Sequence, residues 1–268
     1  MLTSVRNPRV KDVIKLRNRR HRDRERRFVV EGTRELSCAQ ESGLALATLY
    51  YCEELLADGA RKVVDGVAAM AVECQPTSRP VFEKMSYRHT PDGVLGVAPM
   101  PDLELERLPE TDDALWLVAV GIEKPGNLGA MLRTADAVGV AGMVVADPMT
   151  DMFNPNVVRA SMGTLFNVPV AVANGKEVHD WLERRRIRSI VGRPDAAVEY
   201  HRAELRGAVA ITVGSEHSGL DARWSSPRHE AVRIPMAGRA DSLNAAMAAA
   251  VLLFEACRQR REFDPTPR

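Results

Sequence analysis

Residues 233–260, RIPMAGRADSLNAAMAAAVLLFEACRQR, place a loop rich in turn-forming and polar residues directly before the most apolar segment of the chain. From 245 to 257 nearly every residue is small or apolar, and basic residues follow, so the sequence predicts a buried helix that ends at the surface. The loop contains Pro235, Gly238 and Asn244. Such a loop is either a helix cap, with Asp241 or Ser242 satisfying free amides, or part of a binding site.

Composition limits the class of protein. The chain has 268 residues, 45% hydrophobic and 27% charged, which predicts a globular protein of one large domain or two modest ones. Its four cysteines form no CxxC pair, which favours reduced thiols and a cytoplasmic location. No apolar leader segment and no run of about 18 apolar residues is present, so we expect neither a signal peptide nor a membrane span.

The first thirty residues form a strongly basic arm within a chain of net charge +1. Between positions 6 and 27, eleven lysines and arginines stand against three acidic residues. The arm is either a solvated helix face or a phosphate-binding patch. For the second alternative, the candidate RNA-binding residues are Arg19, Arg20, Arg26 and Arg27.

Strand-like and helix-like segments alternate twice, which predicts an α/β fold. The first alternation ends near residue 100, and a stretch with two prolines and several acidic residues follows. The predicted organisation is therefore a small domain with the basic arm at 1–100, a linker at 101–112 and a second domain at 113–268. In the second domain the strands are continuously apolar, which indicates a parallel sheet covered on both faces.

Ligands of parallel sheets bind beyond the carboxyl ends of the strands. That rule points to three loops rich in glycine and small polar residues, GIEKPGN at 121–127, GSEHSG at 214–219 and PMAGRADSLN at 235–244. Taken singly, each loop can be ordinary turn or capping chemistry. None has the GxGxxG or GxxxxGK[ST] spacing of dinucleotide and triphosphate sites. The histidines show no ligand spacing, so we expect no metal site.

Together, NLGAMLRTADAVG at 127–139, VGSEHSGL at 213–220 and IPMAGRADSLNAAMAAAVLLFEA at 234–256 resemble the three motifs of the SpoU (TrmH-type) RNA ribose 2′-O-methyltransferases of the SPOUT superfamily. The resemblance spans about 115–261. It implies a deep trefoil knot, S-adenosylmethionine as cofactor, and a homodimer that builds the substrate site across two chains. The first domain, from SVRNPRVKD onward, resembles the RNA-binding domain of many members, which has a ribosomal-protein L-thirty-e type α/β fold.

The resemblance also assigns roles to residues of the three loops. The implied catalytic residues are Asn127, Arg133, Glu216, Ser242 and Asn244. Because a guanidinium stays protonated in proteins, we expect Arg133 to clamp the RNA phosphate and the attacking oxygen rather than act as a base, which leaves the proton acceptor open. The cofactor pocket is expected to be lined by Gly214, Ile234, Met236, Gly238 and Leu243, with apolar walls from the larger side chains and close backbone approach at the glycines.

The sequence therefore predicts an S-adenosylmethionine-dependent enzyme that methylates a ribose 2′-hydroxyl of structured RNA. Ribosomal RNA is favoured over transfer RNA because the small amino-terminal domain is more typical of the ribosomal RNA members. An enzyme that confers antibiotic resistance through ribosomal RNA methylation remains an alternative. So does a non-catalytic RNA-binding factor for ribosome assembly, although the complete set of motif residues favours the enzyme.

Overall fold

The computed structural model describes residues 1–215, 219–225 and 229–263. Their contacts divide the chain into two compact units. Unit 1 comprises Met1–Asp102 and Asp151–Asn167, and unit 2 comprises Leu103–Thr150 and Val168–Arg268. The segment Asp151–Asn167 lies within the predicted second domain in sequence, yet its contacts are with unit 1.

Unit 1 is built on a four-stranded mixed sheet in the order β1-β4-β2-β3. Strand β4 pairs antiparallel with β1 and β2, whereas β2 and β3 are parallel. The strands are β1 (Arg27–Glu31), β2 (Thr48–Tyr51), β3 (Glu73–Pro76) and β4 (Val94–Pro99). The helices of unit 1 are α1 (Pro8–Lys15), α2 (Arg19–Glu25), α3 (Thr33–Glu41), η1 (Glu53–Leu55), α4 (Ala60–Ala69), α5 (Arg79–Met85), α7 (Pro155–Ser161) and η3 (Thr164–Phe166).

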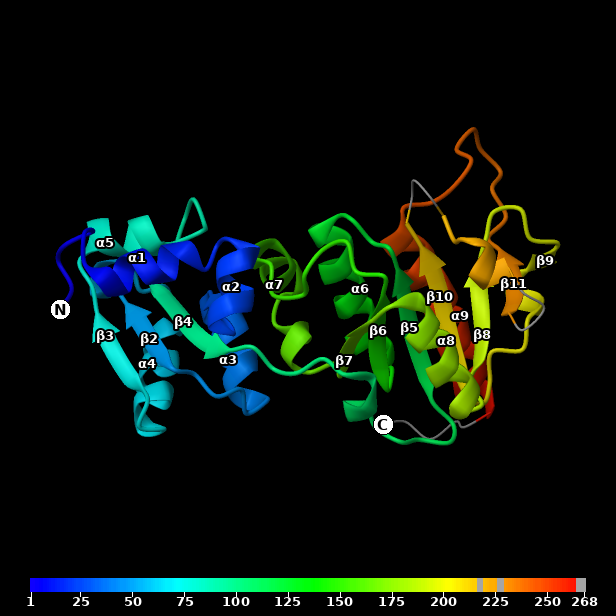
Figure 1. Cartoon of the computed structure of the whole chain (residues 1–268), viewed down its shortest axis with the longest axis horizontal. Helices are drawn as coiled ribbons and strands as arrows, with labels where there is room; N and C mark the ends of the chain where they lie inside the picture. The colour runs from blue at the N-terminus through cyan, green and yellow to red at the C-terminus, as the bar shows by residue number, and fades with distance from the viewer. Residues whose placement is uncertain (216–218, 226–228, 264–268) are drawn as a thin grey trace. The chain divides into compact units, whose positions relative to one another are not determined.

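The basic arm folds as α1 and α2 (Figure 1). Asn7 and Asn18 cap the two helices, each accepting a hydrogen bond from a backbone N–H two residues on. Val10 and Val13 are buried in a cluster with Phe82 of α5. The arm is therefore anchored by an apolar face, and its arginines stand on a fixed surface.

Unit 2 contains a seven-stranded sheet in the order β7-β6-β5-β10-β8-β11-β9, and every pairing is parallel. The strands are β5 (Leu115–Val120), β6 (Gly142–Ala146), β7 (Val170–Ala173), β8 (Arg188–Gly192), β9 (Val198–Glu199), β10 (Val209–Gly214) and β11 (His229–Arg233). Strands β5 and β6 are buried along their whole length, so the predicted parallel sheet with two covered faces is confirmed.

Helices cover both faces of this sheet, with α8 in front of it and α9 behind it in Figure 1. The helical elements of unit 2 are η2 (Leu105–Arg107), α6 (Pro125–Val138), α8 (Gly175–Arg184), η4 (Tyr200–Arg202), η5 (Ala222–Ser225) and α9 (Ala245–Phe263). Trp116 of β5 meets Trp181 of α8 edge to face, with ring centroids 5.1 Å apart. Leu105 and Leu108, within the predicted linker, are buried in the same core.

The apolar segment at 245–257 is helical and lies within α9. Leu252 and Leu253 are fully buried, and α9 packs against α6 and β10. Met247 and Phe254, seven residues apart, are instead 62% and 55% exposed. The helix is therefore apolar on more than the face that its own unit covers. No described helix is long and apolar enough to cross a bilayer.

Candidate functional site

A cavity of about 380 Å³ lies beyond the carboxyl ends of neighbouring parallel strands of unit 2. Its walls include Gly192 at the end of β8, Gly214 at the end of β10 and Ile234 directly after β11. The lining residues are Gly192, Arg193, Pro194, Asp195, Val213, Gly214, Ser215, Gly219, Leu220, Val232, Ile234, Met236, Asp241, Ser242, Leu243, Ala245, Ala248 and Leu252. Two of the three loops selected from the sequence thus converge on one cavity, as the strand-end rule predicts.

Four of the five residues proposed for the cofactor line this cavity. They are Gly214, Ile234, Met236 and Leu243. The fifth, Gly238, is exposed and is not among the lining residues, and an added Cβ there would meet no heavy atom within 4 Å. Close packing therefore does not explain a glycine at position 238 in this structure, and its role in the cofactor site stays a prediction.

Gly214 sits where the backbone of the cavity wall turns back on itself. A Cβ at this position would lie 2.5 Å from the carbonyl oxygen of Gly219, closer than van der Waals contact allows. Gly219 donates its N–H to the carbonyl of Ser215 at 3.0 Å, and both residues line the cavity. The two backbone segments can pack this closely only because residue 214 has no side chain.

Two of the five proposed catalytic residues are hydrogen-bonded to each other. Asn244 donates from Nδ2 to Oδ1 of Asn127 at 3.2 Å, which joins the amino-terminal ends of α9 and α6. The Oδ1 atom of Asn244 also accepts the backbone N–H of Ala246, so the same side chain caps α9. The sequence suggested Asp241 or Ser242 as the cap of this helix, whereas this capping hydrogen bond is made by Asn244, and a catalytic role for Asn244 stays a prediction. Ser242 lines the cavity, and Glu216 lies outside the described residues.

Arg133 lies apart from this asparagine pair in the single chain. It is exposed on α6, and no hydrogen bond or ion pair joins its side chain to any residue that the structure describes. Six residues of helix separate it from Asn127, a rise of about 9 Å and a rotation of about 240°, so the two side chains occupy different faces. The charge of Arg133 is therefore presented to solvent or to a partner.

The loop after β8 was missed in the sequence reading. Arg193, Pro194 and Asp195 line the cavity, and Arg193 forms an ion pair with Asp195 at 2.8 Å. Hydrogen bonding from Arg193 lowers the pKa of the Asp195 carboxyl below its usual value. The rule that selected the other loops also applies to this one, because the apolar strand RSIVG ends at Gly192. The loop lacks the glycine-rich composition that drew attention to the other three.

A second missed feature fixes the segment that follows Leu220. Arg223 donates to Asp147 Oδ2 at 2.9 Å and to Asp221, while Asp147 Oδ1 accepts the N–H of Gly175 at 2.8 Å. The hydrogen bond from Arg223 also holds the pKa of Asp221 below its usual range. The adjacent Trp224 is buried against His179, with ring centroids 4.1 Å apart, and burial lowers the pKa of His179. These contacts anchor one end of the wall formed by Gly219 and Leu220.

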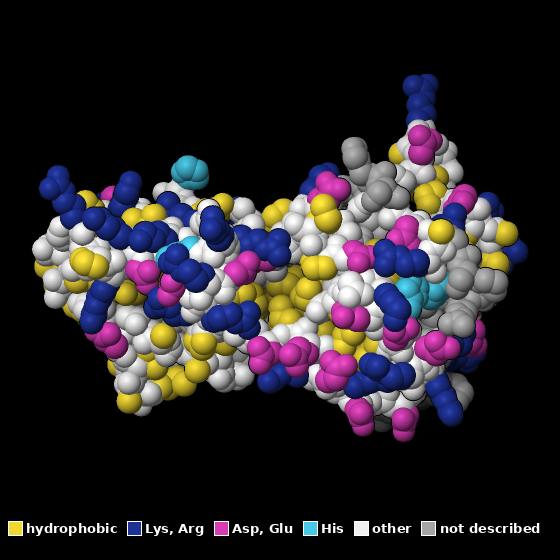
Figure 2. Space-filling view, in the orientation of Figure 1, with side chains coloured by type: hydrophobic (Ala, Val, Ile, Leu, Met, Phe, Trp, Pro, Cys, Tyr) yellow, Lys and Arg dark blue, Asp and Glu magenta, His cyan; other side chains and the backbone are white. Residues whose placement is uncertain are grey.

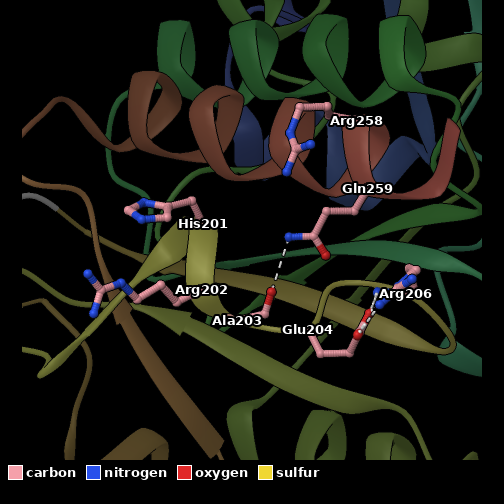
Figure 3. Close-up of a pocket in the computed structure, with 7 residues that line it drawn as sticks. All are labelled: His201, Arg202, Ala203, Glu204, Arg206, Arg258 and Gln259. Atoms are coloured by element: carbon pink, nitrogen blue, oxygen red, sulfur yellow. Dashed lines mark hydrogen bonds and ion pairs between the residues drawn. The ribbon is translucent and has the colours of Figure 1, made fainter. Parts of the chain in front are cut away.

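Another cavity, of about 350 Å³, lies between η4 and α9 (Figure 3). Gln259 spans it, donating to the carbonyl of Ala203 at 3.1 Å and accepting from the N–H of Leu205 at 3.0 Å. Glu204 is paired with Arg206, which lowers the pKa of Glu204 to about 2. None of the proposed site residues lines this cavity, so we do not assign the cofactor to it.

The proposed RNA-binding arginines all lie in unit 1. Arg26 pairs with Asp102 at 3.2 Å, and the partly buried Arg27 pairs with Asp12 at 2.9 Å. Arg19 is 3.6 Å from Asp23, and Arg20 is exposed without an ion pair among the described residues. Lysine and arginine side chains gather over α1 and α2 in Figure 2. Arg20 is therefore more available to a phosphate than the ion-paired, partly buried Arg27.

No group of three or more histidine, cysteine, aspartate or glutamate side chains in the described ranges could hold a metal ion.

The chain resembles known proteins over both units. Residues 114–254 match the SpoU rRNA Methylase family, and residues 7–96 match the MRM3-like substrate binding domain. A 23S rRNA (uridine(2479)-2′-O)-methyltransferase of Streptomyces viridochromogenes is 35% identical over 91% of this chain and 87% of its own length.

Two solved structures are similar to the chain along nearly its whole length. An RNA 2′-O ribose methyltransferase superposes with a TM-score of 0.84 at 42% identity, covering 97% of this chain and 98% of that one. An AdoMet-bound rRNA methyltransferase from Sinorhizobium meliloti superposes with a TM-score of 0.88 at 30% identity, covering 96% and 97%. The agreement extends through the amino-terminal unit as well as the parallel sheet, and the chain belongs to the SpoU rRNA methylase family.

Proposed function

We propose that this chain transfers a methyl group from S-adenosylmethionine (AdoMet) to a ribose 2′-hydroxyl of ribosomal RNA. The observation that carries the proposal is the cavity at the carboxyl ends of β8, β10 and β11. The loop 235–244 forms part of its wall and ends at Asn244, which is hydrogen-bonded to Asn127. Membership of the SpoU rRNA methylase family and the activities named for its relatives support the reaction and the class of RNA.

The cavity fits AdoMet in its chemistry. Apolar side chains such as Ile234, Leu243 and Leu252 offer walls for an adenine ring, and the backbone of Gly214 forms part of the lining. Asp195 and Asp241 place carboxylates in the lining, which suit ribose hydroxyls and an ammonium group. The similar structure from Sinorhizobium meliloti is AdoMet-bound, which supports the same cofactor here.

The chain's own residues position the acceptor for the reaction. When bound, AdoMet supplies an electrophilic methyl group on a sulfonium sulfur. Asn127 and Asn244 hold each other and offer amide groups that can orient the ribose hydroxyl, while Ser242 offers a hydroxyl at the cavity wall. We assign Arg133 to the RNA phosphate and the attacking oxygen, and keep Glu216 as a catalytic candidate. The 2′-oxygen loses its proton as the new C–O bond forms, and its acceptor is left open.

We propose three finer features, of which the first two follow from the family resemblance. We propose that the chain forms a deep trefoil knot around the segment 234–244. The helix α9 follows β11 in sequence but packs against β10, which supports this proposal. We propose an L-thirty-e type fold for unit 1, which the match to the MRM3-like substrate binding domain supports. We also propose a cytoplasmic location, consistent with the four free cysteines.

We further propose a homodimer that buries the exposed side of α9. Met247 and Phe254 lie on one stripe of the helix and remain open to solvent in the single chain. A second copy of this chain would cover that stripe, and the two-fold dimer is the commonest arrangement of soluble oligomers. A substrate site built across two chains would also give the exposed Arg133 a partner.

Phe254→Glu is expected to convert the dimer to a monomer, because a carboxylate buried in an apolar contact between two copies loses its hydration without gaining a partner. Light scattering after gel filtration should give twice 29.5 kDa for the natural protein and 29.5 kDa for the variant. Met149→Glu, at a residue of unit 2 that is 63% exposed, is the matched control and should stay dimeric. A single-chain mass for the natural protein at micromolar concentration would refute the dimer.

The activity itself is tested by incubating the purified protein with tritiated AdoMet and ribosomal RNA. We expect radioactive methyl in the RNA and, on mapping, one or more ribose positions that resist alkaline cleavage because the 2′-oxygen can no longer attack its phosphate. Transfer RNA is the comparison substrate. RNA binding without transfer to either RNA would favour the non-catalytic assembly factor instead, and labelled transfer RNA alone would redirect the proposal to that class.

Charge reversal of Arg19 and Arg20 to glutamate is expected to weaken RNA binding and make its salt dependence shallower. Each lost phosphate contact lowers the slope of log affinity against log salt by about 0.9 for duplex regions. Lys176→Glu with Arg184→Glu, two exposed cations of α8, is the control and should leave the slope unchanged. Filter binding across a salt series measures both. Identical slopes for the natural protein and the Arg19/Arg20 variant would reduce the arm to a solvated face.

A further inference from the structure

We propose that Tyr87 of unit 1 is a stacking platform for an unpaired base of the RNA. This inference rests on the proposed function, because it assumes that structured RNA is the substrate. Tyr87 follows α5 and is 40% exposed, although its backbone, its ring and its hydroxyl each have a defined contact. None of the family motifs quoted from the sequence includes it.

The backbone at Tyr87 is held by a buried carboxylate. Glu31, at the end of β1, is only 8% exposed, and its Oε2 accepts the N–H of Tyr87 at 2.7 Å. Its other oxygen accepts the hydroxyl of Ser86. Arg88 donates to the carbonyl of Glu31 at 2.9 Å and pairs with Glu35 at 2.7 Å. The residues on both sides of Tyr87 are thus anchored to the core of unit 1, which fixes the point from which the ring projects.

The ring is held at two further places. The guanidinium of Arg17 lies 5.9 Å from the ring centroid and is itself fixed by hydrogen bonds to the carbonyls of Lys84, Met85 and Ser86. The hydroxyl of Tyr87 accepts from Asn156 Nδ2 at 3.1 Å, and Asn156 Oδ1 accepts from Arg159 at 3.2 Å. Both residues of α7 belong to unit 1, so the whole arrangement lies within one compact unit.

A fixed but exposed tyrosine fits a role in base stacking better than a purely structural role in the core. A tyrosine serving only the core would be buried, whereas Tyr87 is 40% exposed. Arg17 lies over the ring, so a base would stack on the face opposite Arg17. Stacking on a ring that is already immobile costs little further conformational entropy. Unpaired bases of RNA are commonly recognised by stacking on aromatic side chains, and each such contact contributes about 1–3 kcal/mol.

The surroundings favour RNA over a protein partner. Arg17 and Arg159 adjoin the ring or its hydroxyl partner, and Lys84, whose carbonyl Arg17 binds, is exposed. Basic side chains gather over the neighbouring α1 and α2 (Figure 2). The other large apolar side chains of unit 1 that are exposed are Met1, Val5 and Met70, all outside its helices and strands. A protein interface would need a contiguous apolar patch, whereas a base needs one ring and nearby cations.

The test compares Tyr87→Leu, which removes the π face, with Tyr87→Trp, which keeps one. The probes are transcribed 23S rRNA, which has many unpaired bases, and a blunt RNA duplex, which has none. We expect Tyr87→Leu to weaken binding to 23S rRNA about 5- to 150-fold. Affinity for the duplex and the salt slope on both RNAs should stay those of the natural protein. Tyr87→Trp should bind 23S rRNA within about threefold of the natural protein, because any aromatic face can stack.

Two controls separate stacking from other roles. Tyr87→Phe removes only the hydrogen bond with Asn156, so its melting temperature and affinity measure that contact alone. The Arg19/Arg20 reversal should weaken the binding of both RNAs and lower the salt slope. Tyr87→Leu should instead weaken the binding of 23S rRNA alone and leave the salt slope unchanged.

Equal binding of 23S rRNA by Tyr87→Leu and the natural protein would overturn the platform, and so would equal losses on 23S rRNA and duplex. Losses of the same size in the Leu and Trp variants would likewise overturn it, in favour of a structural tyrosine. If the natural protein neither binds nor methylates ribosomal RNA, the proposed function itself fails. If the natural protein binds and methylates ribosomal RNA, and Tyr87→Leu binds 23S rRNA as tightly as the natural protein, the platform alone is wrong.

Discussion

Arg133→Ala is expected to lower the rate of methyl transfer by about 10²–10³-fold or more while leaving AdoMet affinity nearly unchanged. The side chain is exposed and has no described partner, so its removal leaves no buried group unsatisfied and costs the fold little. If the guanidinium clamps the RNA phosphate and the attacking oxygen, its loss removes positioning and electrostatic stabilisation together. Calorimetry with AdoMet and tritiated-methyl transfer to ribosomal RNA measure the two effects separately.

Two further variants sharpen this test. Arg133→Lys should restore little activity, because an ammonium cannot reproduce a planar two-pronged contact. Asp136→Ala, at another exposed position of α6, is the matched control and should retain full activity. Activity of Arg133→Ala within about threefold of the natural protein would remove this residue from the mechanism. A parallel loss of AdoMet binding would instead make it a structural residue of the cofactor pocket.

The architecture of unit 2 could be predicted because its pattern is strong and local. Strands such as β5 and β6 are apolar along their whole length, and glycine or polar loops mark where they end. Once a parallel sheet is inferred, the strand-end rule brings distant loops to one edge, and the cavity joins Gly214 with Ile234 and Leu243. Only the resemblance assigned Asn127 and Asn244 to one site, and their hydrogen bond was not predicted, because nothing local relates residues 117 positions apart.

What could not be predicted depends on contacts between distant segments. The segment Asp151–Asn167, which contains α7, packs within unit 1 through contacts such as the ion pair of the buried Arg22 with Asp151 at 2.6 Å. Arg22 is one of the eleven cations between positions 6 and 27 of the basic arm, yet it is 1% exposed. Composition alone cannot tell a buried, paired arginine from a solvated one such as Arg20.

Tyr87 and Arg223 escaped the sequence reading for a related reason. Each has a role only through contacts with residues remote in sequence, Glu31 and Asn156 for the tyrosine and Asp147 for the arginine. Neither lies in a glycine-rich loop or in a charge cluster that would draw attention. Periodicity, turn residues and charge describe neighbours along the chain rather than neighbours in space.

Gly214→Ala is expected to weaken AdoMet binding about 5- to 150-fold. Overpacking costs about 1–3 kcal/mol, and this range of fold-changes follows if the whole cost falls on the binding free energy of AdoMet. The new methyl group would lie 2.5 Å from the carbonyl oxygen of Gly219 and 2.8 Å from Cγ of Leu220. Two of its neighbours are backbone atoms, which cannot rotate away as the end of a flexible side chain can. The wall formed by Gly219 and Leu220 must therefore move, and both residues line the cavity.

The segments on either side of the wall formed by Gly219 and Leu220 are fixed, so we expect the wall itself to move and relieve this strain. Strand β10 is paired on both sides, with β5 and β8, and Trp224 and Arg223 anchor the chain beyond Leu220. Gly126→Ala is the matched control, since a Cβ at this position of α6 would meet nothing within 4 Å and alanine favours a helix. Calorimetry on both variants, each first shown to be folded by its melting curve, decides the matter. An AdoMet affinity for Gly214→Ala equal to that of Gly126→Ala would mean that the wall at Gly219 is not part of the cofactor site.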